Sequence, residues 1–181
     1  MMEKIVLFIQ GVGEGAYDAD QKLVDSLQKA LGVDYRVIYP RMPDEDNPAS
    51  KAWKSAIAEA LARLDGAVIV VGHSVGAFIV LKYLSEEPVH QSISGIFLLA
   101  APYVGAGGWE VGESPLRDDF AAWLPKAPLF FYHSRDDETV PFDHLALYTA
   151  KLPYTTVREL DTGGHQFNND LSEVASDILR L

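Results

Sequence analysis

The sequence predicts an α/β fold in which a mostly parallel sheet is covered by helices on both faces. Two observations support this prediction. Strand signals and helix signals alternate along the chain, which is the pattern of parallel sheets. The 181 residues, 48% of them hydrophobic, suffice for one sizeable core but hardly for two. We therefore expect residues 1–181 to form a single domain.

The first part of the chain supplies three predicted strands and two predicted helices. Residues 4–10, 34–39 and 67–72 are short apolar runs bounded by glycine or polar residues. Residues 20–31 and 50–64 carry apolar residues at helical spacing, and each segment ends close to a glycine. The residues on these two apolar faces are Leu23, Leu27, Ala30, Leu31, Trp53, Ile57, Ala60, Leu61 and Leu64.

The second part continues the alternation and contains one longer excursion. The predicted elements are helix 76–85, strand 94–101, strand 127–133, helix 142–152, strand 154–160 and helix 169–181. Residues 102–126 connect two of the strands and are the only sizeable insertion. About six strands are therefore expected, with right-handed crossovers that place helices on both faces.

A nucleophile elbow is the most specific motif in the chain. The apolar run 67–72 leads directly into Gly72-His73-Ser74-Val75-Gly76 and then into helical sequence. A serine on so tight a turn has strained backbone angles, and flanking glycines remove the collisions that larger residues would cause. The alternative is that Ser74 simply caps the following helix. The pattern favours Ser74 as a nucleophile, with His73 as structural packing beside it.

The sequence also provides an acid and a base for this serine. Asp137 lies in a polar loop after strand 127–133, and His165 follows the last strand. Ligands of parallel sheets bind at the carboxyl ends of the strands, where Ser74, Asp137 and His165 would all lie. His165 can accept the serine proton, and Asp137 can orient the imidazole. Asp136 competes with Asp137 for the second role.

These residues together resemble small α/β-hydrolases of the YdeN-like and retinoblastoma-binding-protein-like type. The resemblance covers nearly the whole chain, and its order Ser74, Asp137, His165 is that of the α/β-hydrolases. It rests on Gly-His-Ser-Val-Gly at 72–76, Asp137-x-x-Val-Pro, Gly164-His165, and strand 5–9 followed by Gln10-Gly11-Val12. It implies an α/β-hydrolase fold with strand order 2-1-3-4-5-6, a minimal lid, and no antiparallel strands before the first strand.

The resemblance further implies a serine hydrolase that needs no cofactor and cleaves esters, thioesters or amides through an acyl-enzyme. It does not imply a substrate. The backbone N–H of Val75, at the start of a helix, is one expected donor to the oxyanion. By resemblance, the second donor is the N–H of Val12. Gln10 occupies the position where this loop commonly has histidine.

The excursion 102–126 is the expected source of substrate contacts. We hypothesise a shallow pocket for small or medium acyl groups, partly roofed by this segment, with Gly11, Tyr103 and Trp109 in contact with substrate. The alternative is that its aromatic residues only complete the core. The acidic loop 40–48 is expected to border the site and to disfavour anionic substrates.

Composition excludes several other functions. The net charge of −11 and the pI of about 4.7 argue against binding to nucleic acid or to anionic membranes. Without cysteine there is no disulfide or thiolate metal site, and His90, His133 and His144 lack metal-ligand spacing, so no metal is expected. The expected partner is a small acyl substrate, and the oligomeric state is left open. We expect a cytoplasmic location, because the sequence shows no signal-peptide pattern and no apolar segment of membrane-spanning length.

Two rival functions belong to other classes. Residues 11–16 satisfy G-x-G-x-x-A, a dinucleotide fingerprint, with Arg41 as a possible partner for a phosphate. Glu14, Asp18 and Asp20 would repel a pyrophosphate there. The other rival is a catalytically silent hydrolase fold that acts as a binding module, although such a protein would be expected to lack part of the triad or elbow.

Overall fold

The sheet sets the architecture of the protein. In this computed structural model, which describes residues 3–181, six parallel strands follow the order β2-β1-β3-β4-β5-β6. The strands are Lys4–Ile9 (β1), Tyr35–Ile38 (β2), Ala67–His73 (β3), Ser92–Leu99 (β4), Leu129–Ser134 (β5) and Thr156–Leu160 (β6). The predicted α/β fold class and strand order are confirmed.

Seven helical segments occur within the described residues. They are Ala16–Leu31 (α1), Ser50–Ala62 (α2), Val75–Glu86 (α3), Phe120–Trp123 (α4), His144–Lys151 (α5), the 3₁₀ turn Phe167–Asn169 (η1) and Ser172–Ile178 (α6). Helix α1 begins four residues earlier than predicted, because Gly15 adopts a left-handed conformation and starts the helix there. Helix α4 lies inside the excursion, where no helix was predicted.

The prediction of one helix over 169–181 is wrong at its start. Phe167, Asn168 and Asn169 all have positive φ, which interrupts any continuous helix, and α6 begins only at Ser172. Asparagine tolerates this backbone region, whereas Phe167 must be held there by its packing. Its side chain is buried in the core beneath α1 and α6.

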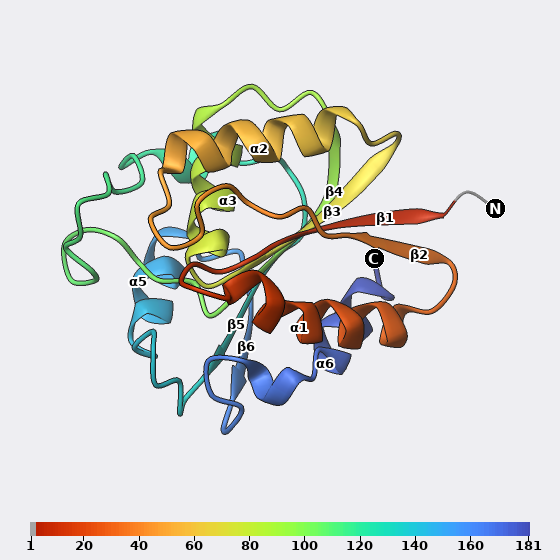
Figure 1. Ribbon diagram of the computed structural model, residues 1–181. Helices are drawn as coiled ribbons and strands as arrows, with labels where there is room; N and C mark the ends of the chain where they lie inside the picture. Colours follow the sequence, from red (N-terminus) through yellow and green to blue (C-terminus); the bar gives the residue numbers. More distant parts are fainter. Residues whose placement is uncertain (1–2) are drawn as a thin grey trace.

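Each face of the sheet has its own core. Ile5, Leu7 and Ile9 of β1 pack with α2, α3 and α5, while Val6 and Phe8 pack with α1 and α6. Figure 1 shows α2 and α3 together on one side of the sheet and α1 and α6 together on the other.

The parallel arrangement places the loops after β1, β3, β5 and β6 at a common edge, which is where the candidate site lies. None of the helices in residues 3–181 combines the length and the apolar composition that crossing a membrane requires.

Candidate active site

Ser74 lies on a strained turn between β3 and α3. Its backbone angles are φ 54° and ψ −132°, a conformation that non-glycine residues rarely adopt. A Cβ at Gly72 would lie 2.7 Å from Cα of Ala77, and a Cβ at Gly76 would lie 2.0 Å from the carbonyl oxygen of Gln10. Only glycine fits at these two positions, so the elbow presses tightly against both α3 and the loop after β1.

Ser74, His165 and Asp137 form a continuous hydrogen-bonded chain. Nε2 of His165 is 2.9 Å from Oγ of Ser74, and Nδ1 of His165 is 3.0 Å from Oδ2 of Asp137. The loops after β3, β5 and β6 supply one residue each. The structure thus brings the three residues together in an arrangement that can take a proton from the hydroxyl, since Asp137 fixes the tautomer that leaves Nε2 as the acceptor.

Asp137 is held as a carboxylate although its side chain is fully buried. Burial alone would raise its pKa, but hydrogen bonds from His133, His165 and the backbone N–H of Val140 hold the pKa of Asp137 well below its usual range. Nε2 of His133 lies 3.2 Å from Oδ2 of Asp137 and 3.0 Å from the carbonyl oxygen of Val140. His133 is therefore a buried structural residue.

The structure distinguishes Asp137 from its neighbours in the same loop. The carboxylate of Asp136 accepts hydrogen bonds from the N–H groups of Gly163 (3.3 Å) and Gly164 (2.8 Å). Oε2 of Glu138 accepts one from the N–H of His165 at 3.1 Å. Asp136 and Glu138 thus hold the backbone of the loop that carries His165, whereas Asp137 alone meets its imidazole.

The two amides expected to bind an oxyanion are available. Within residues 3–181, the N–H groups of Val75 and Val12 donate to no protein acceptor. The side chain of Gln10 fixes the loop that carries Val12, because it donates to Glu45 at 2.8 Å and accepts from the N–H of Met42 at 2.9 Å. The residue at the usual histidine position of this loop thus ties it to the acidic loop 40–48.

The start of α1 is already occupied by a carboxylate of the protein itself. Glu45 accepts hydrogen bonds from the N–H groups of Gly15 (3.3 Å) and Tyr17 (2.9 Å). The N–H of Tyr17 and the amide of Gln10 hold the pKa of Glu45 below its usual value. A pyrophosphate would need these same N–H groups, so the glycines of 11–16 do not form a dinucleotide site here.

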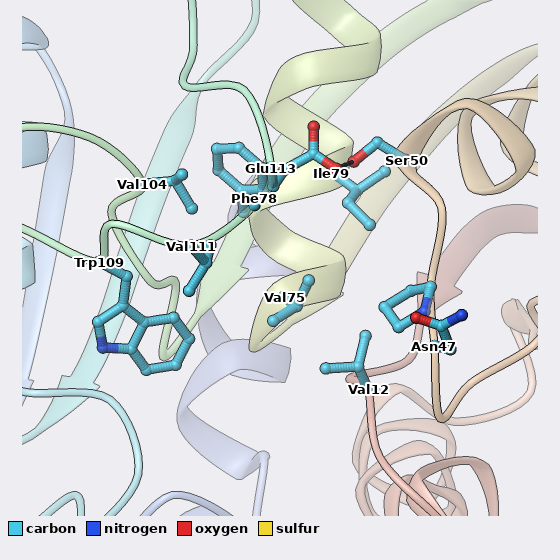
Figure 2. Close-up of a pocket in the computed structure, with 12 residues that line it drawn as sticks. Val12, Asn47, Ser50, Val75, Phe78, Ile79, Val104, Trp109, Val111 and Glu113 are labelled. Atoms are coloured by element: carbon cyan, nitrogen blue, oxygen red, sulfur yellow. Dashed lines mark hydrogen bonds between the residues drawn. The ribbon is translucent and has the colours of Figure 1, made fainter.

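A largely apolar cavity of about 510 Å³ opens beside the elbow. Figure 2 shows Trp109, Val104 and Val111 on one side, Val12 and Asn47 on the other, and Val75 between them. Ser50 donates a hydrogen bond to Glu113, and both residues line this cavity. Its remaining lining residues are Pro48, Phe78, Ile79 and Gly112.

A smaller and more polar cavity of about 280 Å³ lies next to Ser74. Ser74, His165, Glu14, Glu138 and Gly11 are among its lining residues. Val12 borders both cavities, so the loop after β1 lies between them. Neither lining, within the described part of the chain, includes a lysine or an arginine.

The aromatic residues of the excursion 102–126 have different surroundings. Trp109 lines the larger cavity, and Phe120 is buried in the core. Tyr103 lines neither cavity; its ring packs edge-on against Tyr148, and its N–H donates to Nδ1 of His144 at 2.9 Å. Trp123 is 59% exposed. The excursion therefore both roofs a cavity and completes the core.

Sequence reasoning missed Asp20, whose carboxylate lies 2.8 Å from Nδ1 of His73. Both side chains are almost fully buried, so His73 is more than the packing residue that was expected. One signal was available, because Asp20 stands at helical spacing from Leu23 and Leu27 and therefore on the apolar face of α1. A carboxylate on such a face needs a buried partner.

Comparisons with known proteins bear on the family and the fold. Residues 20–171 match the model of a family described as serine hydrolase. The structure is similar to the ydeN gene product of B. subtilis (TM-score 0.72, 17% identity, 98% of this chain and 97% of that chain covered). It is also similar to an esterase from Exiguobacterium antarcticum (TM-score 0.74, 15% identity, 99% and 91% covered).

A thioesterase domain from the curacin biosynthetic pathway gives a TM-score of 0.70 at 17% identity, with 98% of this chain and 91% of that chain covered. At such identities the three likenesses support the fold alone. A comparison by sequence with curated proteins gives no significant match.

Proposed function

The chain belongs to the serine hydrolase family, and from that premise we propose that it is a cofactor-independent esterase or thioesterase acting through Ser74, His165 and Asp137. The observation that carries the proposal is the unbroken chain of contacts from Oγ of Ser74 to Nε2 of His165 and from Nδ1 of His165 to Asp137. A serine in this arrangement is a nucleophile with its base already in place.

The reaction has two stages. Oγ of Ser74 attacks the carbonyl carbon while its proton passes to Nε2 of His165, and the N–H groups of Val75 and Val12 stabilise the oxyanion. Collapse of the tetrahedral intermediate breaks the bond to the leaving group, which takes the proton from His165. Water then attacks the acyl-enzyme with His165 again as base, which releases the acid and restores the serine.

The two cavities fit the two halves of such a substrate. The leaving group must receive its proton from His165, so its place is the smaller cavity, whose lining includes that residue. The acyl chain then extends past Val75 into the larger cavity, whose volume of about 510 Å³ suits small or medium acyl groups. Among the described residues, the lining of the leaving-group cavity includes carboxylates but no lysine or arginine. Neutral or cationic leaving groups are therefore favoured over anionic ones.

An activated serine can be tested without knowledge of the substrate. The protein is exposed to a fluorophosphonate, and its intact mass is compared with that of Ser74→Ala. We expect a single adduct on the unmodified protein and none on Ser74→Ala. The rate of labelling should fall as the pH is lowered, because protonated His165 cannot accept the serine proton.

Ser55→Ala is the matched control. Ser55 is an exposed serine on α2 whose hydroxyl donates to the carbonyl of Lys51, and its loss should leave labelling unchanged. Absence of an adduct on the folded, unmodified protein would refute the proposal. The alternative of a silent hydrolase fold used for binding would then be preferred.

A further inference from the structure

Asp20 and His73 form a buried ion pair directly beside the nucleophile. Their side chains are 2% and 3% exposed, and Oδ2 of Asp20 lies 2.8 Å from Nδ1 of His73. His73 is the last residue of β3 and precedes Ser74, while Asp20 comes from α1. The mechanism above uses neither residue.

The surroundings of His73 require a proton on each ring nitrogen. Nδ1 faces the Asp20 carboxylate, and Nε2 is 2.9 Å from the carbonyl oxygen of His165. Both partners are hydrogen-bond acceptors, so both contacts are satisfied only by an imidazolium. Burial disfavours this charge, but the Asp20 carboxylate and the His165 carbonyl raise the pKa of His73 above its usual value. Burial likewise opposes ionisation of Asp20, yet His73 lowers its pKa.

The pair connects three segments that must be aligned for the reaction. Oδ2 of Asp20 accepts a hydrogen bond from the N–H of Gly11 at 2.8 Å, next to the proposed oxyanion donor Val12. Oδ1 of Asp20 accepts one from the amide of Gln166 at 3.1 Å. His73 holds the backbone carbonyl of His165. The oxyanion loop (residues 10–13), the elbow and the loop of the catalytic base therefore meet at one buried carboxylate and one buried imidazole.

We propose that Asp20 and His73 are positioning residues: as an ionised pair they hold the oxyanion loop and the backbone of His165 in register with Ser74. The proposal rests on the function proposed above, since it gives these residues a role only if Ser74 and His165 carry the reaction. It predicts that the pair acts on the turnover step. A misplacement of about 1 Å in a catalytic group can cost roughly 10²-fold in rate.

The charges around the pair give the proposal a signed pH effect. Asp20 from α1, His165 and, farther away, Asp137 face His73. Asp137, Glu138 and the ring of His73 face His165. In His73→Asn the Asp20 carboxylate loses its cation but keeps the hydrogen bonds from Gly11 and Gln166, which favour its charged form. Its unbalanced charge then favours protonation of His165, so the acid limb of the activity profile should move to higher pH. In Asp20→Asn, buried His73 loses its counterion and becomes neutral, so that limb should move less.

The protonation state of His73 can be measured in the unmodified protein. Ring ¹⁵N chemical shifts are recorded by NMR at pH 8, and the His73 signals are assigned in the unmodified protein by through-bond correlation with the backbone resonances of residue 73. We expect both ring nitrogens of His73 to be protonated. A single unprotonated nitrogen at that pH would overturn the ionised pair, even if every variant with an altered pair failed to fold.

The second test is a double-mutant cycle on an activated ester. Asp20→Asn and His73→Asn are each expected to lower kcat by about 10²-fold with a much smaller change in KM. The kcat of the double variant should be no lower than that of the less active single variant, since the effects of residues that act as a unit are not additive. Additive losses, or wild-type kcat in either folded single variant, would overturn the proposal.

Asp25→Asn is the control for the charge change on the same helix, because Asp25 is exposed on α1. It should leave kcat and the pH profile unchanged. Circular dichroism and thermal melting report whether each variant is folded. Absence of fluorophosphonate labelling in the unmodified protein would instead refute the proposed function. Failure of the proposed function can therefore be told apart from failure of the positioning role of Asp20 and His73.

Discussion

The two cavities that meet at Val12, beside the elbow, differ in covering and in charge. The larger one is built from the apolar side of α3 and the excursion after β4, with Trp109 and Val111 over it. The smaller one is built from the start of α1 and the loop of His165, with Glu14 and Glu138 at its edge. One is a largely apolar cavity of about 510 Å³, and the other is a more polar cavity of about 280 Å³.

This difference indicates how one nucleophile can distinguish the two halves of a substrate. The apolar cavity can select an acyl chain by the surface that it removes from water. Under the proposed mechanism, the more polar cavity can select a leaving group by charge, because carboxylates are among its lining residues. The two selections should be separable by mutation, since Val12 and the elbow stand between the cavities.

The largest expected effect is a loss of kcat that does not depend on which group occupies either cavity. Asp137→Asn should lower kcat on the order of 10⁴-fold, because an amide no longer fixes the imidazole tautomer that accepts the serine proton. The loss should be the same for every acyl chain and every leaving group. Steady-state kinetics on a small matrix of esters would measure it.

Asp136→Asn is the matched control for that variant. The Asp136 carboxylate binds the N–H groups of Gly163 and Gly164, and an asparagine oxygen can still accept from one of them. We expect less than about a tenfold loss, in line with a single weakened hydrogen bond of roughly 1 kcal/mol. A larger loss for Asp136→Asn than for Asp137→Asn would reverse the assignment of the triad acid.

The strands and the candidate triad could be predicted because local sequence encodes them. The elbow needs glycine on both sides of Ser74. A side chain at Gly76 would clash, because its Cβ would lie only 2.0 Å from the carbonyl oxygen of Gln10. Parallel strands place loops from distant parts of the chain at one edge, so Ser74, Asp137 and His165 could be grouped before any distance was known.

The remainder depends on tertiary contacts that no local pattern carries. Asp20 pairs with His73, which lies 53 positions away in the sequence. The position of Asp20 on the apolar face of α1 was the one signal that this carboxylate is buried. Within the excursion, nothing in the sequence separates Trp109, which lines a cavity, from Tyr103, which packs against Tyr148. The break at 167–169 comes from a positive φ at Phe167, a residue that favours no such conformation by itself.

A smaller effect should be confined to the apolar cavity. Trp109→Ala removes one wall and opens space for longer chains. The ratio of kcat/KM for octanoyl over butanoyl esters should therefore rise by about tenfold, the low end of what one methylene is worth in a hydrophobic pocket. The preference among leaving groups should not change. Trp123→Ala, on the same excursion but 59% exposed and outside both cavities, should leave the chain-length ratio as it is. An unchanged ratio in Trp109→Ala would remove that residue from the acyl site.

The smallest expected effect is confined to the polar cavity. Glu14 is exposed at its edge and makes no side-chain hydrogen bond within residues 3–181, so Glu14→Gln removes a charge and little else. Exposed charges interact by about 0.2–1 kcal/mol, so the preference for butyrylcholine over its uncharged carbon isostere should fall roughly two- to threefold in Glu14→Gln.

Added salt should reduce the same preference in the unmodified protein, because the Debye length is only about 8 Å at physiological ionic strength. Glu110→Gln removes an equal charge from outside both cavities and should not alter the ratio. If butyrylcholine is no better a substrate than its isostere at low salt, the carboxylates do not select the leaving group. The contrast between the cavities would then be one of shape alone.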